Sequence, residues 1–164
     1  MDRLENPIEN VVWVDVSKLK MNDYNPNKVL RSEMILLELS ITRNGWIQPI
    51  LITEDYEIID GFHRATLAKT SKKIRPFVPC CVMKVTKPEQ MLLTIRMNRA
   101  KGQHVAFKMH HVVTRLHNEY NYSEKELALA IGTSLGEIKL LLQDNVFKKL
   151  DVEKHEYSKA WIPK

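Results

Sequence analysis

The residues best suited to chemistry lie in segment 58–65, where Asp60 and Gly61 are followed by His63 and Arg64. β-Branched residues that run into a glycine and then into helix formers predict a strand that breaks at Gly61 and opens a helix. The N–H groups at a helix start carry partial positive charge and point into the turn. Arg64 adds a fork of donors and His63 a titratable one. This pattern is typical of a phosphate-binding turn.

The same residues have a plainer interpretation. Asp-Gly is an ordinary turn dipeptide, and basic side chains next to a carboxylate often form structural ion pairs. On that interpretation His63 and Arg64 pair with Asp60 and order the turn without binding a ligand. The sequence alone leaves both interpretations open.

A second group of phosphate-compatible donors runs from Asn98 to His104 and includes Arg99 and Lys101. A helix predicted from Pro88 to Asn98 precedes it, with proline at the first turn. We expect the run to lie on a loop after that helix and to close over a ligand. The alternative is a solvated basic loop, which is the usual role of a charge run.

The composition is that of a globular protein with one domain, or one domain plus a small appendage. The chain has 164 residues and a net charge of +5, with a pI of about 9.2. This balance permits a nucleotide or nucleic-acid partner without requiring one. Cys80 and Cys81 are adjacent and lack metal-binding spacing, so we expect reduced, structural thiols and no metal site. No apolar run has membrane length, and we expect a cytoplasmic protein with no membrane partner.

The apolar pattern predicts an α+β fold with a small mixed sheet. Pro79 favours an edge strand or an early position within its strand, because proline cannot donate to a ladder. The segment after residue 45 and the one before Asp60 are predicted to form a hairpin. The expected strands are 11–16, 46–52, 57–60 and 78–85, and the expected helices are 32–44, 65–69 and 88–98.

The segment 105–143 is predicted to be helical and to contain a helix-turn-helix. Two Ser-x-x-Glu capping boxes begin at Ser123 and Ser134, with Gly132 between the two short helices. Lys125 and Lys139 are the candidate DNA-binding residues, because phosphate affinity needs basic side chains. Only Lys139 lies on the second helix, so a packing or partner-binding helical cap is the alternative. The expected organisation is a nucleotide-binding domain over 1–104, the helical segment over 105–145 and a charged tail over 146–164.

Four motifs follow one another along the chain, namely Asn25-Pro26, Ser40-Ile41 with segment 44–50, segment 59–65 and segment 95–98. Together they resemble the ParB N-terminal domain of the ParB/sulfiredoxin superfamily. The resemblance covers about residues 11–104, and the order and spacing of the motifs are more specific than any one of them.

The resemblance implies a bound nucleotide with Mg²⁺. The nucleotide is CTP in ParB-like proteins, and ATP or ADP in sulfiredoxin and in the free-serine kinases of the superfamily. Carried over by position, the turn contacts the phosphates, a loop forms the wall near the sugar or base, and a second motif lies on the phosphate side. These three sets are Gly61, His63 and Arg64; Gln48, Pro49 and Ile50; and Asn98, Arg99 and Gly102.

Departures from the family pattern narrow the function. Phe62 stands where sulfiredoxin has its catalytic cysteine, so no thiol can attack there and sulfiredoxin activity is excluded. We expect a nucleotide-binding, DNA-associated regulatory or accessory protein, in which any NTPase activity is slow and switches a conformation. The alternatives are a small-molecule kinase of the free-serine type, with Asp23 or Glu33 as candidate catalytic base, and a non-catalytic protein partner of a neighbouring enzyme.

Overall fold

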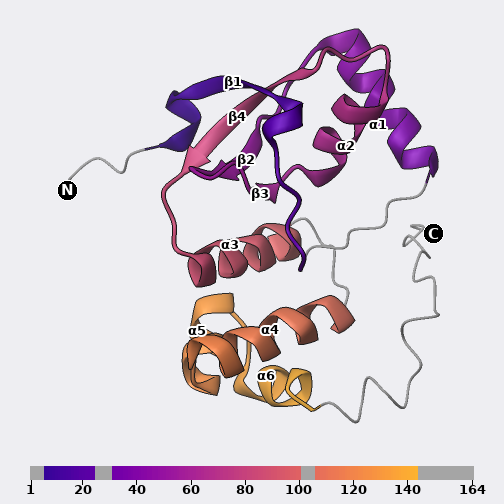
Figure 1. Cartoon of the computed structure of the whole chain (residues 1–164). Helices are drawn as coiled ribbons and strands as arrows, with labels where there is room; N and C mark the ends of the chain where they lie inside the picture. The colour runs from indigo at the N-terminus through magenta and orange to yellow at the C-terminus, as the bar shows by residue number, and fades with distance from the viewer. Residues whose placement is uncertain (1–5, 25–30, 101–105, 144–164) are drawn as a thin grey trace. The chain divides into compact units, whose positions relative to one another are not determined.

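The computed structural model describes residues 6–24, 31–100 and 106–143 of the chain. Contacts between Cα atoms divide the chain into two compact units, residues 1–101 and 102–164. Figure 1 shows a small sheet with helices in the first unit and helices in the described part of the second.

The first unit has the α+β composition that the apolar pattern predicts. Its strands are β1 (Val11–Asp15), β2 (Ile50–Thr53), β3 (Ile58–Asp60) and β4 (Phe77–Met83), and its helices are α1 (Arg31–Asn44), α2 (Phe62–Thr70) and α3 (Lys87–Ala100). Two short 3₁₀ helices, η1 (Pro7–Glu9) and η2 (Val16–Lys18), flank β1.

The four strands form one mixed sheet in the order β1-β4-β2-β3. β1 runs antiparallel to β4, β4 runs parallel to β2, and β2 runs antiparallel to β3. The predicted hairpin is therefore confirmed, and its tight turn ends at Tyr56 with a left-handed φ of 64°. The second strand is shorter than predicted, because β2 begins only at Ile50 and residues 46–49 lead into it.

The edge alternative for Pro79 is wrong, because β4 lies between β1 and β2, whereas the early position is confirmed, because Pro79 is the third of the seven residues of β4. The Val16 N–H donates to the Pro76 carbonyl at 2.7 Å. Hydrogen-bonded and non-hydrogen-bonded pairs alternate in an antiparallel ladder, so the pair of Trp13 with Pro79, three pairs further along, is a non-hydrogen-bonded one. On the other side β2 begins opposite Cys80. Neither neighbouring strand therefore needs an N–H from Pro79.

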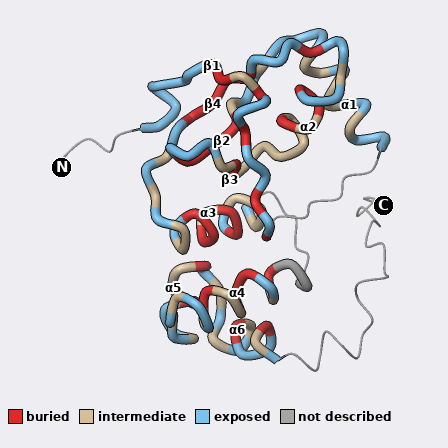
Figure 2. Tube along the Cα trace, in the orientation of Figure 1, coloured by how far each residue is buried: buried red, intermediate tan, exposed pale blue. Residues whose placement is uncertain are grey.

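The main core lies between the sheet and the helices α1 and α2. Met34, Leu37 and Ile41 of α1 pack against buried residues of the sheet and of α2. Helix α3 buries its own apolar face and packs along β3. In Figure 2 the buried segments follow the middle of the sheet and the inner faces of these helices. The edge strand β3 and the start of α2 are thus held from both sides.

The second unit contains α4 (Ala106–Tyr120), α5 (Glu124–Ile131) and α6 (Leu135–Leu141). Gly132 adopts a left-handed φ of 75° and ends α5, as a helix-turn-helix requires. The Ser123–Glu126 capping box forms, and the Ser134 hydroxyl accepts the Glu137 N–H at 3.1 Å. Within the described ranges, no helix is long and apolar enough to cross a membrane.

Candidate functional site

The strand-to-helix turn after Asp60 forms as predicted. β3 ends at Asp60, Gly61 adopts φ 97° and ψ 22°, and α2 begins at Phe62. A Cβ on Gly61 would lie 3.2 Å from both Arg64 Nη2 and Ile50 Cγ1. Glycine is therefore required twice, for its left-handed backbone and for the close approach of two side chains.

The Arg64 side chain folds back and ties the turn to the start of β2. Nη1 donates to the carbonyl oxygens of Gln48 and Pro49, both at 2.7 Å, and Nη2 donates to Asp60 Oδ2 at 3.1 Å. We call this set of contacts the Arg64 clamp. The clamp gathers five of the predicted nucleotide-binding residues around one point, namely Gln48, Pro49, Ile50, Gly61 and Arg64.

The clamp is largely shielded from water. The side chains of Arg64 and Asp60 are 11% and 15% exposed. Burial lowers the pKa of Arg64, and the neighbouring Asp60 carboxylate partly offsets that effect. The structural interpretation of Arg64 is thus realised, since its guanidinium is engaged by protein acceptors. A phosphate would compete with these acceptors for it.

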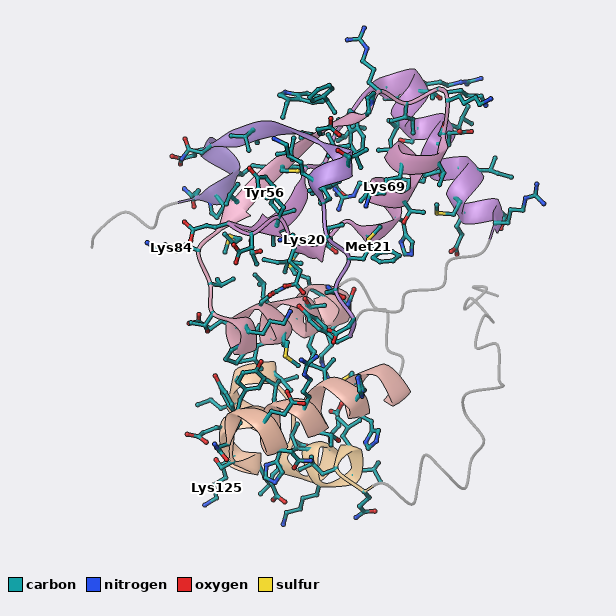
Figure 3. The ribbon with its side chains drawn as sticks, in the orientation of Figure 1. Lys20, Met21, Tyr56, Lys69, Lys84 and Lys125 are labelled. Atoms are coloured by element: carbon teal, nitrogen blue, oxygen red, sulfur yellow. The ribbon has the colours of Figure 1, made fainter. Side chains whose placement is uncertain are left out.

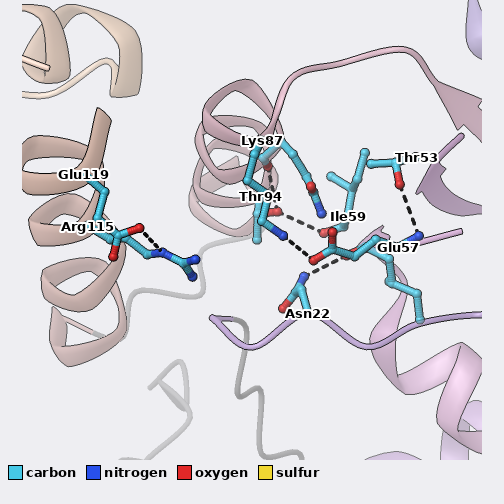
Figure 4. A network of polar contacts seen from close by, with 10 residues as sticks. Asn22, Thr53, Glu57, Ile59, Lys87, Thr94, Arg115 and Glu119 are labelled. Carbon is cyan, nitrogen blue, oxygen red and sulfur yellow. Dashed lines mark hydrogen bonds and ion pairs between the residues drawn. The ribbon is translucent and has the colours of Figure 1, made fainter. Parts of the chain in front are cut away.

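A buried polar network holds β3 from the other side. Asn22 Nδ2 donates to the Ile58 carbonyl at 2.7 Å, and Thr94 Oγ1 of α3 donates to the Ile59 carbonyl at 3.2 Å. Lys87 at the start of α3 pairs with Glu57 at 2.5 Å. Figure 4 shows these contacts converging on the strand that ends at Asp60. The position of the turn is therefore fixed by α3 as well as by α2.

A cavity of about 430 Å³ opens beside the clamp. Its polar end carries Gln48, Asp60 and Arg64, which the clamp joins, and Asn6 is the fourth polar residue of the wall. The rest of the wall is apolar and comes from η1, β2, β4 and α3, with the residues Pro7, Ile8, Pro49, Leu51, Cys81, Met83, Leu93 and Met97. The cavity can hold a ring or sugar against an apolar wall, with hydrogen-bonding groups at one end.

His63 lies in the first turn of α2, where it is half-buried. Its ring meets that of Phe62 edge to face, with ring centroids 5.9 Å apart. The Phe62 ring thus packs against His63, the side chain predicted to contact the phosphates.

Asn98 and Arg99 lie on α3, which extends to Ala100. The expectation that they sit on a loop is wrong, because the helix continues two residues past Asn98. Met97 is the last residue of this helix to line the cavity. Gly102 and His104 lie outside the described residues.

The two candidate catalytic bases are exposed and lie apart from the cavity wall. Asp23 follows the buried Asn22 in the segment that leads away from β1, and Glu33 is in the first turn of α1. Neither is among the described residues that line the cavity.

Sequence reasoning missed most of the cavity wall. Leu51, Cys81 and Met83 share one sheet face, as the pairing of Leu51 with Cys81 requires. Leu93 and Met97 are four residues apart on one face of α3. These periodicities were visible in the sequence, but only the topology brings the two sets together.

The candidate DNA-binding lysines are both exposed in the second unit. Figure 3 shows Lys125 extending outward from α5. Lys139 lies in the last turn of α6. His110 Nδ1 lies 2.5 Å from the Leu141 carbonyl oxygen, so the histidine joins α4 to α6. Within the described ranges, no group of three His, Cys, Asp or Glu side chains is placed to hold a metal ion.

The fold and the strand-to-helix turn match a known family of domains. A family model described as the ParB N-terminal domain matches residues 2–99. The chain belongs to this family. It is 34% identical over 168 residues to the uncharacterized protein YbdM of Escherichia coli K12, an alignment that covers 98% of this chain and 79% of YbdM.

A second relative is longer than this chain. The probable chromosome-partitioning protein ParB of Vibrio cholerae is 30% identical over 157 residues, which cover 90% of this chain and 53% of that protein. The chain thus spans about half the length of the partitioning protein it matches.

Solved structures show the same fold. A pNOB8-like ParB N-domain matches with a TM-score of 0.60 at 15% identity, covering 88% of this chain and 69% of that one. The C-terminally truncated ParB of Caulobacter crescentus, complexed with CTP-γ-S, matches with a TM-score of 0.50 at 21% identity, covering 87% and 84%. The same protein complexed to the centromeric parS site matches with a TM-score of 0.52 at 20% identity, covering 88% and 80%.

Proposed function

We propose that the first unit binds a nucleotide at the turn formed by Gly61, His63 and Arg64, with the base or sugar in the adjacent cavity. The observation that carries this proposal is the left-handed Gly61 opening α2 beside a cavity with a polar end. The helix start supplies N–H donors and positive potential, and the cavity supplies an apolar wall. Membership of the ParB N-terminal domain family and the CTP-γ-S complex of the Caulobacter crescentus protein support this assignment.

The base of the nucleotide distinguishes two branches of the superfamily. CTP, bound with Mg²⁺, corresponds to a ParB-like switch, and ATP or ADP to the kinase-like branch. The ParB relatives favour CTP. Gln48 is exposed at the polar end of the cavity, where a side-chain amide can both donate to and accept from a base edge.

Calorimetric titration of CTP, ATP and ADP with Mg²⁺ tests the site. We expect binding of one nucleotide by the wild-type protein and a loss of at least tenfold in affinity in His63→Ala. Arg64→Ala is the less clean variant, because it also removes the clamp. Lys72→Ala, which removes an exposed positive charge beyond the end of α2, should bind as the wild type does. Failure of all three nucleotides to bind would refute the proposal.

We further propose that the second unit associates with double-stranded DNA through α5 and α6, so that the protein acts as a nucleotide-dependent regulatory or accessory factor. The support is the helix-turn-helix geometry around Gly132 and the exposure of Lys125 and Lys139. The Caulobacter crescentus ParB complexed to parS is a relative in fold with a DNA partner.

A gel-shift series across salt concentrations tests the DNA proposal. Each lost phosphate contact should reduce the salt slope of log K by about 0.9. We expect that reduction in Lys139→Ala and no change in Lys84→Ala, an exposed lysine of the first unit. If no shift occurs at low salt, DNA binding is refuted. Docking of a protein partner then becomes the better role for this unit, because Leu129 on α5 is 86% exposed.

A further inference from the structure

Strand β1 forms one edge of the sheet and is unusually apolar for an exposed edge. Its sequence is Val-Val-Trp-Val-Asp, and Val11, Val12 and Trp13 are 41%, 45% and 61% exposed. Within the described ranges β1 pairs with β4 alone. Proteins normally protect such edges with lysine, proline or a covering element. β1 contains neither lysine nor proline.

The pairing with β4 shows which backbone groups of β1 face outward. The Val16 N–H donates inward to Pro76, so the alternating residues before it, at positions 14 and 12, also bond inward to β4. The N–H and C=O groups of Val11, Trp13 and Asp15 therefore point away from the sheet. Val11 and Asp15 are spaced evenly on either side of Trp13.

We propose that the open edge of β1 pairs antiparallel with β1 of a second copy of this chain, about a two-fold axis at Trp13. In this register Trp13 faces Trp13 of the other copy, and Val11 faces Asp15 in both directions. All three outward-facing residues then form hydrogen-bonded pairs, each with two N–H···O=C bonds. The interface is isologous, as a two-fold dimer requires.

The chemistry of the edge favours a second copy over a charged peptide. Asp15 is the single charge on β1, and its carboxylate already accepts the Ser17 N–H at 2.8 Å. An acidic strand would therefore find no counter-charge on β1, and a basic strand would find only Asp15. Phe77 of β4, which lies opposite Asp15 and is 51% exposed, adds apolar surface beside the strand. An identical apolar edge matches all of these features.

The contact is short, so association should be weak. A stable dimer usually buries about 1,600 Å² in total, and two five-residue strands with their flanking side chains supply less than that. We expect a dimer that appears only at high protein concentration, as is typical of small interfaces.

Sedimentation equilibrium tests the proposal with matched variants. We expect the mass of the wild-type protein to rise from 19.2 kDa toward twice that value with concentration. Trp13→Lys should remain monomeric, because an edge lysine opposes pairing. Ile35→Lys changes a residue of α1 that is 57% exposed, and should dimerise as the wild type does. A protein that is monomeric throughout, or a dimer unaffected by Trp13→Lys, would overturn the proposal.

Cross-linking tests the register without relying on a lysine at the edge. Hydrogen-bonded antiparallel partners lie about 5.5 Å apart at Cα, within the range that a disulfide spans. Mild oxidation of Trp13→Cys should therefore give a linked dimer in high yield, whereas Ile35→Cys should not. The native thiols Cys80 and Cys81 are buried and should not interfere. Equal yields from the two variants would show random collision and refute the pairing. A Trp13 amide protected from exchange in a monomer would show that another segment of the same chain covers the edge.

Discussion

Replacement of Arg64 by alanine tests whether the Arg64 clamp stabilises the first unit. The substitution removes three hydrogen bonds and the ion pair of Arg64 with the Asp60 carboxylate, which is 15% exposed. Breaking a buried ion pair from one side costs about 3–5 kcal/mol. Because water still reaches both side chains, we expect the low end, a loss of about 3 kcal/mol in the free energy of unfolding. A domain of ordinary stability, about 5–15 kcal/mol, remains folded after such a loss.

Matched variants separate charge from geometry in the clamp. Arg64→Lys keeps the charge but cannot reproduce the planar fork that reaches two carbonyls and a carboxylate, so we expect about half of the loss. In a double-mutant cycle, Arg64→Ala and Asp60→Ala should show a coupling energy of about 1–2 kcal/mol.

Hydrogen exchange of the β2 and β4 amides in increasing urea is the suitable assay, because it reports the first unit alone. A loss of less than about 1 kcal/mol in the free energy of unfolding of Arg64→Ala, the size of one ordinary hydrogen bond, would refute the stabilising role of the clamp. In that case the guanidinium would not be held by the protein and would be available to a phosphate.

Three further predictions follow from the backbone, the thiols and the caps. Left-handed backbone strain alone costs about 1–2 kcal/mol, and Gly61→Ala should destabilise the first unit by more than this. Gly45 has φ 76° and nothing within 4 Å of an added Cβ, so Gly45→Ala should show the strain alone. Parallel urea titrations compare the two variants. Burial raises the pKa of Cys80 from its ordinary 9.0 to about 11, so the thiol's contribution to stability is present below pH 9.0 and is lost as pH rises toward about 11. Urea titrations between pH 9 and 11 should show a smaller fall in the free energy of unfolding for Cys80→Ala than for the wild type. The same fall in both proteins would contradict the raised pKa of Cys80. Ser123→Ala should lower the stability of the second unit by about 1 kcal/mol, measured by exchange of the α5 amides, and an unchanged α5 would contradict the capping role.

Local patterns in the sequence predicted the elements well. Three features depend on turn residues and on short-range periodicity: the hairpin, the strand-to-helix turn at Gly61 and the helix-turn-helix around Gly132. Both kinds of signal can be read from a single sequence. These features formed as expected because their determinants lie within a few residues of each other.

The errors arose where distant segments decide the outcome. Pro79 is accommodated inside the sheet because both of its neighbours happen not to need its N–H. Arg64 turns toward Gln48 and Pro49, which are more than ten residues away in the sequence, so its partners depended on the tertiary fold. The loop predicted at Asn98 failed because donor-rich composition says little about where a helix ends.

The placement of Asn98 and Arg99 on a helix bears on how quickly a ligand could be captured. The same helix carries Thr94, which is hydrogen-bonded to the strand one residue before Asp60. The turn and the end of α3 therefore belong to one rigid frame, and their separation is set before any ligand arrives. A preorganised frame loses little conformational entropy on association. For a ligand that touches both, the described frame adds no closing step of its own, so association is governed by diffusion and orientation.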